Sequence, residues 1–110
     1  MQTSINEEVL KKETESLVNN LEKMEHYVYA DASLFVLMDE CDDKELSSKI
    51  KECSMITESR IDSIQSLIID TIEKSNYKNE LIEELQSFVK YSETYSFEDT
   101  CKEGKLGKYL

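Results

Sequence analysis

The sequence contains no proline and only two glycines, Gly104 and Gly107. Both glycines stand near the C-terminus, so no strong helix breaker interrupts the chain before Gly104. An all-β sandwich requires turn residues at short and regular intervals, and their absence argues against that architecture. We therefore predict a chain that is built of long helices.

Motifs that mark several enzyme and targeting classes are missing as well. The N-terminus has no basic region followed by an apolar one, so we expect no secretory signal, and no apolar run reaches membrane-spanning length. Glycine loops that bind nucleotide phosphates are absent, and His26 is the single histidine. We expect no cofactor, no membrane association, and an exposed or partly packed His26.

The three cysteines, Cys41, Cys53 and Cys101, form no CxxC pair and leave one thiol unmatched. Such usage is typical of reduced thiols in the cytosol, so we expect a soluble cytoplasmic protein. Cys53 lies on an apolar stripe and Cys41 continues an apolar segment. We therefore expect both thiols to be buried and structural.

The formal net charge is -11, from 24 acidic and 13 basic residues. Contact with nucleic-acid phosphates needs clustered lysine and arginine, so this charge disfavours direct nucleic-acid binding and favours a protein partner with a basic surface. The segment from Lys102 onward is locally basic. Without it, the rest of the chain has 10 basic and 23 acidic residues, a charge of -13.

The most regular apolar pattern lies between Asp42 and Ser75. Small or apolar residues recur there at spacings of four, three and four: Leu46, Ile50, Cys53, Thr57, Ile61, Ile64, Ile68 and Ile72. This eleven-residue repeat corresponds to about 3.67 residues per turn, which is typical of a nearly straight helix. We predict a core-facing helix over 43–75, capped by Asp42 together with Glu45.

A first helix is predicted over 4–41, with Ser4 and Glu7 as a capping box. Asp31 interrupts its apolar stripe, so either the helix bends there or Asp31 faces a polar partner inside the bundle. Because neither glycine nor proline is nearby, we favour one long helix, with a kink as the alternative.

From Tyr27 to Met38 this first helix is apolar on almost every side. A helix with one solvent-facing side does not need so many apolar residues, so a second side must be covered. The candidates are the C-terminal segment, a second copy of the chain, or a different protein.

The C-terminal third of the chain predicts a helix over 77–95, a short helix over 97–103 capped by Ser96, and a tail over 104–110 that is either frayed or docked. The inner stripe of the third helix is expected to comprise Leu81, Leu85, Phe88, Ser92 and Tyr95. The predicted fold is all-α: a bundle of three long antiparallel helices with a short fourth helix, in a single domain over 1–110.

One enzymatic alternative rests on two acidic pairs, Glu22-x-x-Glu25 and Glu40-x-x-Asp43. This arrangement is similar to that of the all-α nucleoside-triphosphate pyrophosphatases. The resemblance implies that the four carboxylates hold magnesium against the phosphates of the substrate. The sequence shows no lysine or arginine cluster nearby to bind the triphosphate.

The leading hypothesis is a non-enzymatic protein-binding module that occupies a basic or nucleic-acid-binding surface of its partner. In overall character the chain resembles small acidic inhibitors, namely phage anti-defence proteins (including anti-CRISPR proteins), antitoxins and bacteriocin immunity proteins. The expected contacts are Tyr27, Tyr29, Asp62, Glu73, Glu80, Glu83, Glu84, Tyr91 and Tyr95. The alternative is a homodimeric assembly protein that is closed by the Tyr27–Met38 band.

Overall fold

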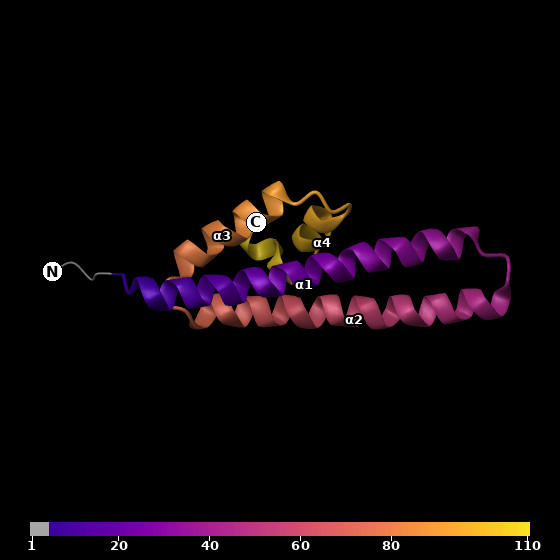
Figure 1. Cartoon of the computed structure of the whole chain (residues 1–110), viewed down its shortest axis with the longest axis horizontal. Helices are drawn as coiled ribbons and strands as arrows, with labels where there is room; N and C mark the ends of the chain where they lie inside the picture. Colours follow the sequence, from indigo (N-terminus) through magenta and orange to yellow (C-terminus); the bar gives the residue numbers. More distant parts are fainter. Residues whose placement is uncertain (1–4) are drawn as a thin grey trace.

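The computed structural model describes residues 5–110 as an all-α bundle (Figure 1). The elements follow in the order α1 (Glu7–Glu40), α2 (Lys44–Lys74), α3 (Lys78–Tyr91), α4 (Phe97–Glu103) and the 3₁₀ helix η1 (Lys105–Tyr109). No strand occurs among these residues. The predicted all-α fold is confirmed.

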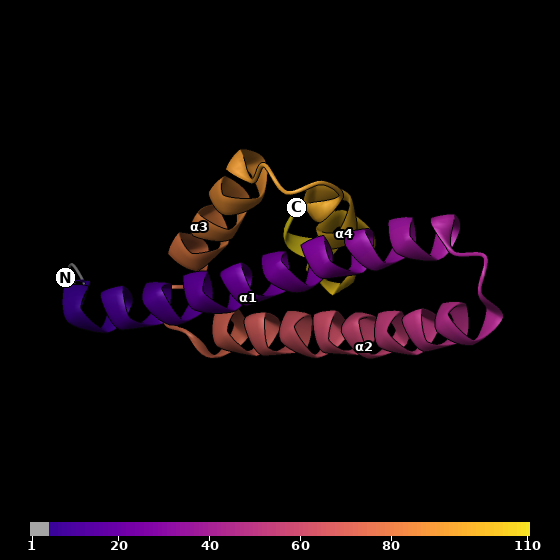
Figure 2. The ribbon, with the colours of Figure 1, turned by 45° about the vertical axis from the view of Figure 1, so that its right-hand side comes forward.

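Helices α1 and α2 form an antiparallel hairpin that runs the length of the molecule (Figures 1 and 2). Both helices begin later than predicted, α1 at Glu7 instead of residue 4 and α2 at Lys44 instead of residue 43. Asn6 caps α1 by accepting a hydrogen bond from the Val9 amide, whereas Ser4 lies outside the described residues. Asp43, not Asp42, caps α2 and accepts from the amides of Glu45 and Leu46.

Helix α1 is not interrupted at Asp31 and is continuous from Glu7 to Glu40. The Asp31 carboxylate accepts a hydrogen bond of 2.7 Å from the Ser54 hydroxyl of α2. The sequence left open whether the helix bends at Asp31 or Asp31 faces a polar partner, and the structure shows the polar partner. A half-buried carboxylate needs such a partner, because removing it from water without a hydrogen bond is costly.

The hydrophobic core occupies only one half of the hairpin, where α3, α4 and η1 cover it. Ile61, Ile64 and Ile68 are buried there, as the eleven-residue repeat predicted. The buried set from all elements is Leu17, Leu21, Met24, Val28, Ile61, Ile64, Ile68, Ile72, Leu81, Leu85, Val89, Phe97, Cys101 and Leu106.

Helix α3 ends at Tyr91, four residues before the predicted end. The Ser92 hydroxyl accepts from the Thr94 amide and donates to the Glu25 carboxylate at 2.6 Å, so it anchors the turn that follows. Tyr95, which was predicted to lie on the inner stripe, is 80% exposed in the connection to α4. Val89 lies in the core instead.

Helix α4 has the predicted bounds, but its start differs from the predicted cap. Ser96 adopts a left-handed conformation (φ 66°) and its side chain makes no capping hydrogen bond. The tail is docked rather than frayed, because Leu106 is fully buried against the core. Phe97 is also fully buried and packs edge-on against Phe88, with ring centroids 5.8 Å apart.

Candidate protein-binding surface

The other half of the hairpin, residues 29–60, extends beyond the covering elements and is called the arm here (Figures 1 and 2). No residue of the arm is buried. The last buried residue of α1 is Val28 and the first of α2 is Ile61. In the arm, α1 and α2 therefore form two layers, and the third layer that α3, α4 and η1 add elsewhere in the molecule is absent.

Large apolar side chains are exposed on the arm. Phe35 is 67% exposed and Met55 is 62% exposed. The complete set of exposed large hydrophobic residues of the arm is Tyr29, Phe35, Val36, Leu37, Leu46, Met55 and Ile56. The C-terminal segment, one of the three candidates for covering the Tyr27–Met38 band, thus leaves most of this band uncovered.

The same geometry corrects the predicted burial of Cys53 and Cys41. Cys53 is exposed and Cys41 is half-buried, and Leu46 on the same apolar stripe is 51% exposed. The stripe faces α1, but a single neighbouring helix cannot enclose it. Cys101 is the buried thiol, and burial, with a smaller effect of the Glu98 charge, raises its pKa to about 12.

A groove of about 810 Å³ lies where the arm meets α4. Val28, Ala32 and Ile61 provide apolar lining, and Phe35 and Val36 of the arm extend it. Its charged lining residues are all acidic: Asp31, Glu58, Asp62 and Glu103. This groove was not predictable from the sequence, because it forms only where α4 packs against the hairpin.

The four tyrosines predicted to contact a partner are not equivalent. Tyr29, Tyr91 and Tyr95 are exposed, and Tyr29 lies on the arm while Tyr95 lines the groove. Tyr27 is half-buried against the core, and the guanidinium of Arg60 lies 5.7 Å from its ring centroid. Tyr29 and Tyr95 are therefore available at the arm and the groove, whereas Tyr27 belongs mainly to the internal packing.

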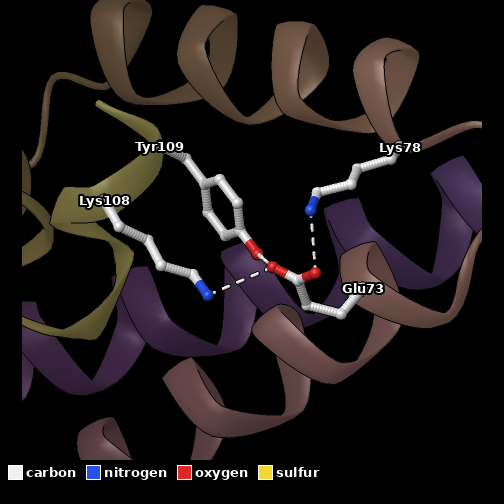
Figure 3. A network of polar contacts seen from close by, with 4 residues as sticks. All are labelled: Glu73, Lys78, Lys108 and Tyr109. Carbon is white, nitrogen blue, oxygen red and sulfur yellow. Dashed lines mark hydrogen bonds and ion pairs between the residues drawn. The ribbon is translucent and has the colours of Figure 1, made fainter.

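Glu73, another predicted contact, is the centre of an internal network that holds the C-terminal segment (Figure 3). Its carboxylate accepts from Lys78 at 2.8 Å, from Lys108 at 3.1 Å and from the Tyr109 hydroxyl. The hydrogen bonds from Lys78, Tyr109 and Lys108, in that order, lower the pKa of Glu73 to about 2. Glu73 is thus ionised, and its carboxylate is already engaged in hydrogen bonds within the molecule.

Asp62 and Gln65 of α2 hold the start of the tail. Lys105 donates to the Asp62 carboxylate at 3.0 Å and to the Ser66 hydroxyl at 2.7 Å. Gln65 is 4% exposed, and its side-chain oxygen accepts from the Leu106 amide at 3.3 Å. The role of Gln65 was not predicted from the sequence. A glutamine beside Ile64 and Ile68 on a core-facing stripe could have indicated a buried polar contact.

Gly104 and Gly107 are both required by close approaches. A Cβ atom on Gly104 would collide with the side chain of Gln65 and lie 2.9 Å from the Thr100 carbonyl oxygen. A Cβ atom on Gly107 would collide with the carbonyl oxygen of Lys102, which is backbone and cannot swing away. The two glycines therefore allow the tail to fold back onto α2.

Glu80, Glu83 and Glu84 are exposed on α3, as expected for surface contacts. Glu84 lines a shallow acidic hollow with Glu22 and Glu25 of α1. This hollow lies on the covered half of the molecule, away from the arm. The predicted acidic contacts thus fall into separate places on the surface.

The two acidic pairs of the enzymatic alternative are not brought together in this chain. Glu25 and Glu40 belong to the same continuous helix, and the rise over fifteen residues separates them by about 22 Å. Asp43 is occupied in capping α2. Within residues 5–110 no group of three or more histidine, cysteine, aspartate or glutamate side chains is placed to hold a metal ion.

None of the described helices combines the length and the apolar character needed to cross a bilayer. The arm without buried residues and the acidic groove at its base are the distinctive features of the described residues. Searches with family models, against curated proteins and against solved structures found no match to this chain.

Proposed function

We propose that this protein is a non-enzymatic binding module that docks onto a basic surface of a partner protein and blocks that surface. The arm is the part that makes contact, and its acidic residues orient the encounter. The single observation that carries this proposal is that none of the residues 29–60 is buried, although many of them are large and apolar.

The energetic basis is the incomplete burial of the arm. A helix pair in water gains most of its stability from the apolar faces that it buries, and the arm buries them only partly. Apolar patches of this kind, surrounded by polar residues, are typical of protein-interaction sites. A partner that covers the arm adds the missing third layer and removes its apolar surface from water.

The charge determines what kind of partner fits. The arm has eight acidic and four basic residues, and the whole chain has a net charge of -11. A negative surface accelerates association with a positive one and repels nucleic acid. A partner whose basic surface normally binds nucleic acid meets both conditions, so the proposed action is inhibition by occupancy.

Self-association is the second candidate, since two arms packed side by side would also cover the exposed apolar residues. The observation that favours it is that these residues extend along both helices, from Phe35 to Ile56. The same pairing would bring two negatively charged arms into contact, which costs free energy at low salt. For this reason the foreign partner is preferred.

The proposal is tested by capture from a native lysate at low and high salt, followed by competition with nucleic acid. The test variant is Ile56→Ser on the arm, outside the groove, and the matched control is Leu67→Ser on the same helix outside the arm, since both side chains are 54% exposed. We expect the wild type and the control to capture one partner that releases its nucleic acid. We expect the test variant to capture much less of it.

Two results would contradict the proposal. One is a partner that binds both variants equally, because the contact would then lie elsewhere. The other is a bound partner that still holds its nucleic acid, because the basic surface would then be free. A salt-resistant dimer that forms without any partner would assign the arm to self-association.

A further inference from the structure

We propose that the groove at the base of the arm binds an amphipathic helix of the partner, with an apolar stripe that faces the groove and lysine or arginine residues along both sides. This inference rests on the proposed function and identifies which part of the partner is recognised. Three properties of the groove support it: the shape, the backbone and the charge.

The shape is that of a vacant third layer. In the covered half of the molecule, α3 and α4 lie across the α1–α2 hairpin, and this layer stops at α4 and the connection that precedes it (Figure 2). The groove begins along this edge of the layer, bounded by Tyr95, Thr100 and Glu103, and continues onto the arm through Ala32 and Val36. An added helix there would lie on the hairpin as α4 does.

The backbone of the groove favours a helix over an extended peptide. Both long walls are α-helices, whose amides and carbonyls are paired within each helix, so the groove offers no edge to which a strand could add. Recognition must then use side chains. An apolar lining of Val28, Ala32 and Ile61 is suited to the anchor residues of one helical face.

The charge of the groove decides between a basic partner and a second copy. Four carboxylates line it, from Asp31, Glu58, Asp62 and Glu103, and no lysine or arginine does. Lys105 forms an ion pair with Asp62 at 3.0 Å, whereas none of the ion pairs within residues 5–110 involves Asp31, Glu58 or Glu103. A second copy of this acidic chain would place carboxylates against carboxylates, whereas lysine or arginine on the bound helix would pair with them.

The probe for the test is a fluorescein-labelled model helix of about 18 residues, roughly 27 Å long, that contains only leucine on one face and lysine on the other. Fluorescence anisotropy measures its binding to the full-length protein at low and at physiological salt. Two comparison peptides are used: one with the same composition in scrambled order, and one with glutamate in place of lysine.

The variants come in matched pairs. Val36→Lys places a charge in the groove, and Leu67→Lys makes the same change at a position that is equally exposed but outside it, since the two side chains are 55% and 54% exposed. Glu58→Lys reverses a charge of the lining, and Glu15→Lys reverses an exposed charge on the distant half of α1. All four positions are exposed or accessible, so the fold is retained.

We expect the leucine–lysine helix to bind the wild type and both controls, and to bind each groove variant about tenfold or more weakly. Equal binding of the scrambled peptide, or equal loss in the control variants, would overturn the inference, because attraction would then be a property of the overall charge. Binding of the glutamate peptide, or no binding of the lysine peptide, would also overturn it.

The outcome is distinguishable from failure of the proposed function. If the partner captured by the wild type is lost with Ile56→Ser but is retained by Val36→Lys and Glu58→Lys, the arm binds the partner and the groove does not receive its helix. If no partner is captured but the model helix binds the groove, the chemistry of the groove is established and the proposed inhibition is not.

Discussion

Glu73 is the residue whose replacement tests how the C-terminal segment is held to α2. Its depressed pKa of about 2, against an ordinary value of 4.5, means that the ionised form is stabilised in the folded protein. That contribution is complete above the ordinary pKa and is lost as the pH falls from 4.5 to about 2. The stabilisation is electrostatic and is made at the surface, so salt also weakens it.

We therefore expect Glu73→Gln to lower the free energy of unfolding at neutral pH, with a difference from the wild type that shrinks between pH 4.5 and about 2. Urea unfolding at several pH values measures this difference. The exposed Glu83 on α3 provides the control, since Glu83→Gln makes the same chemical change away from the tail. A difference for Glu73→Gln that persists unchanged at the lowest pH would show that the network does not depend on the charge.

The cysteines allow a second test at single-residue resolution. Burial keeps the Cys101 thiol protonated, with a pKa of about 12, whereas Cys53 is exposed on the arm. We expect a thiol reagent at neutral pH to modify Cys53 first and to leave Cys101 unmodified in the folded protein, because the thiolate is the reactive form. Mass spectrometry of the labelled peptides identifies the sites. Modification of Cys101 as fast as Cys53 would mean that α4 is not packed as described.

At the scale of secondary-structure elements, the 3₁₀ helix η1 docks chiefly through Leu106, which is fully buried. We expect Leu106→Ala to reduce the free energy of unfolding by about 2–5 kcal/mol, the usual effect of removing a buried leucine side chain. Leu110→Ala is the control, because Leu110 is 38% exposed. Thermal or urea unfolding compares the two. Equal effects of both substitutions would show that the tail contributes little to the core.

The elements differ in how well their sequences predicted them. Ile61 and Ile68 follow a repeat that any core-facing helix needs, so their helix and their burial were predictable from spacing alone. Leu46 and Cys53 continue the same repeat, yet they are not buried, because whether a stripe is covered depends on how far its neighbours extend. Helix α3 ends at Tyr91, and the part of the hairpin that it covers is set by tertiary packing, which the periodicity of α2 does not predict.

The candidate site was predictable only in part. The surplus apolar band from Tyr27 to Met38 indicated an uncovered face, and the structure leaves half of its large apolar side chains exposed. The internal hydrogen bonds of Glu73 were not predictable, because Lys108 and Tyr109 donate to it from 35 and 36 residues away in sequence. The groove likewise depends on where α4 packs against the hairpin.

At the scale of the whole molecule, the arm makes the protein elongated. Its extents are 67 × 21 × 21 Å and its radius of gyration is 16.8 Å, whereas a compact domain of this length would have a value of about 13 Å. We expect light scattering at micromolar concentration to give the monomer mass of 12.8 kDa, and small-angle X-ray scattering to give an elongated particle. A stable dimer that persists at high salt would contradict this expectation and would assign the arm to self-association.

Hydrogen exchange tests the central claim most directly, since it reports the protection of the arm amides before and after a partner binds. In the free protein we expect the amides of residues 29–60 to exchange faster than those around the buried residues Leu21 and Ile68. In the complex we expect the arm to become protected while the covered half changes little. Protection confined to α3 or to the covered half, with the arm unchanged, would contradict the account.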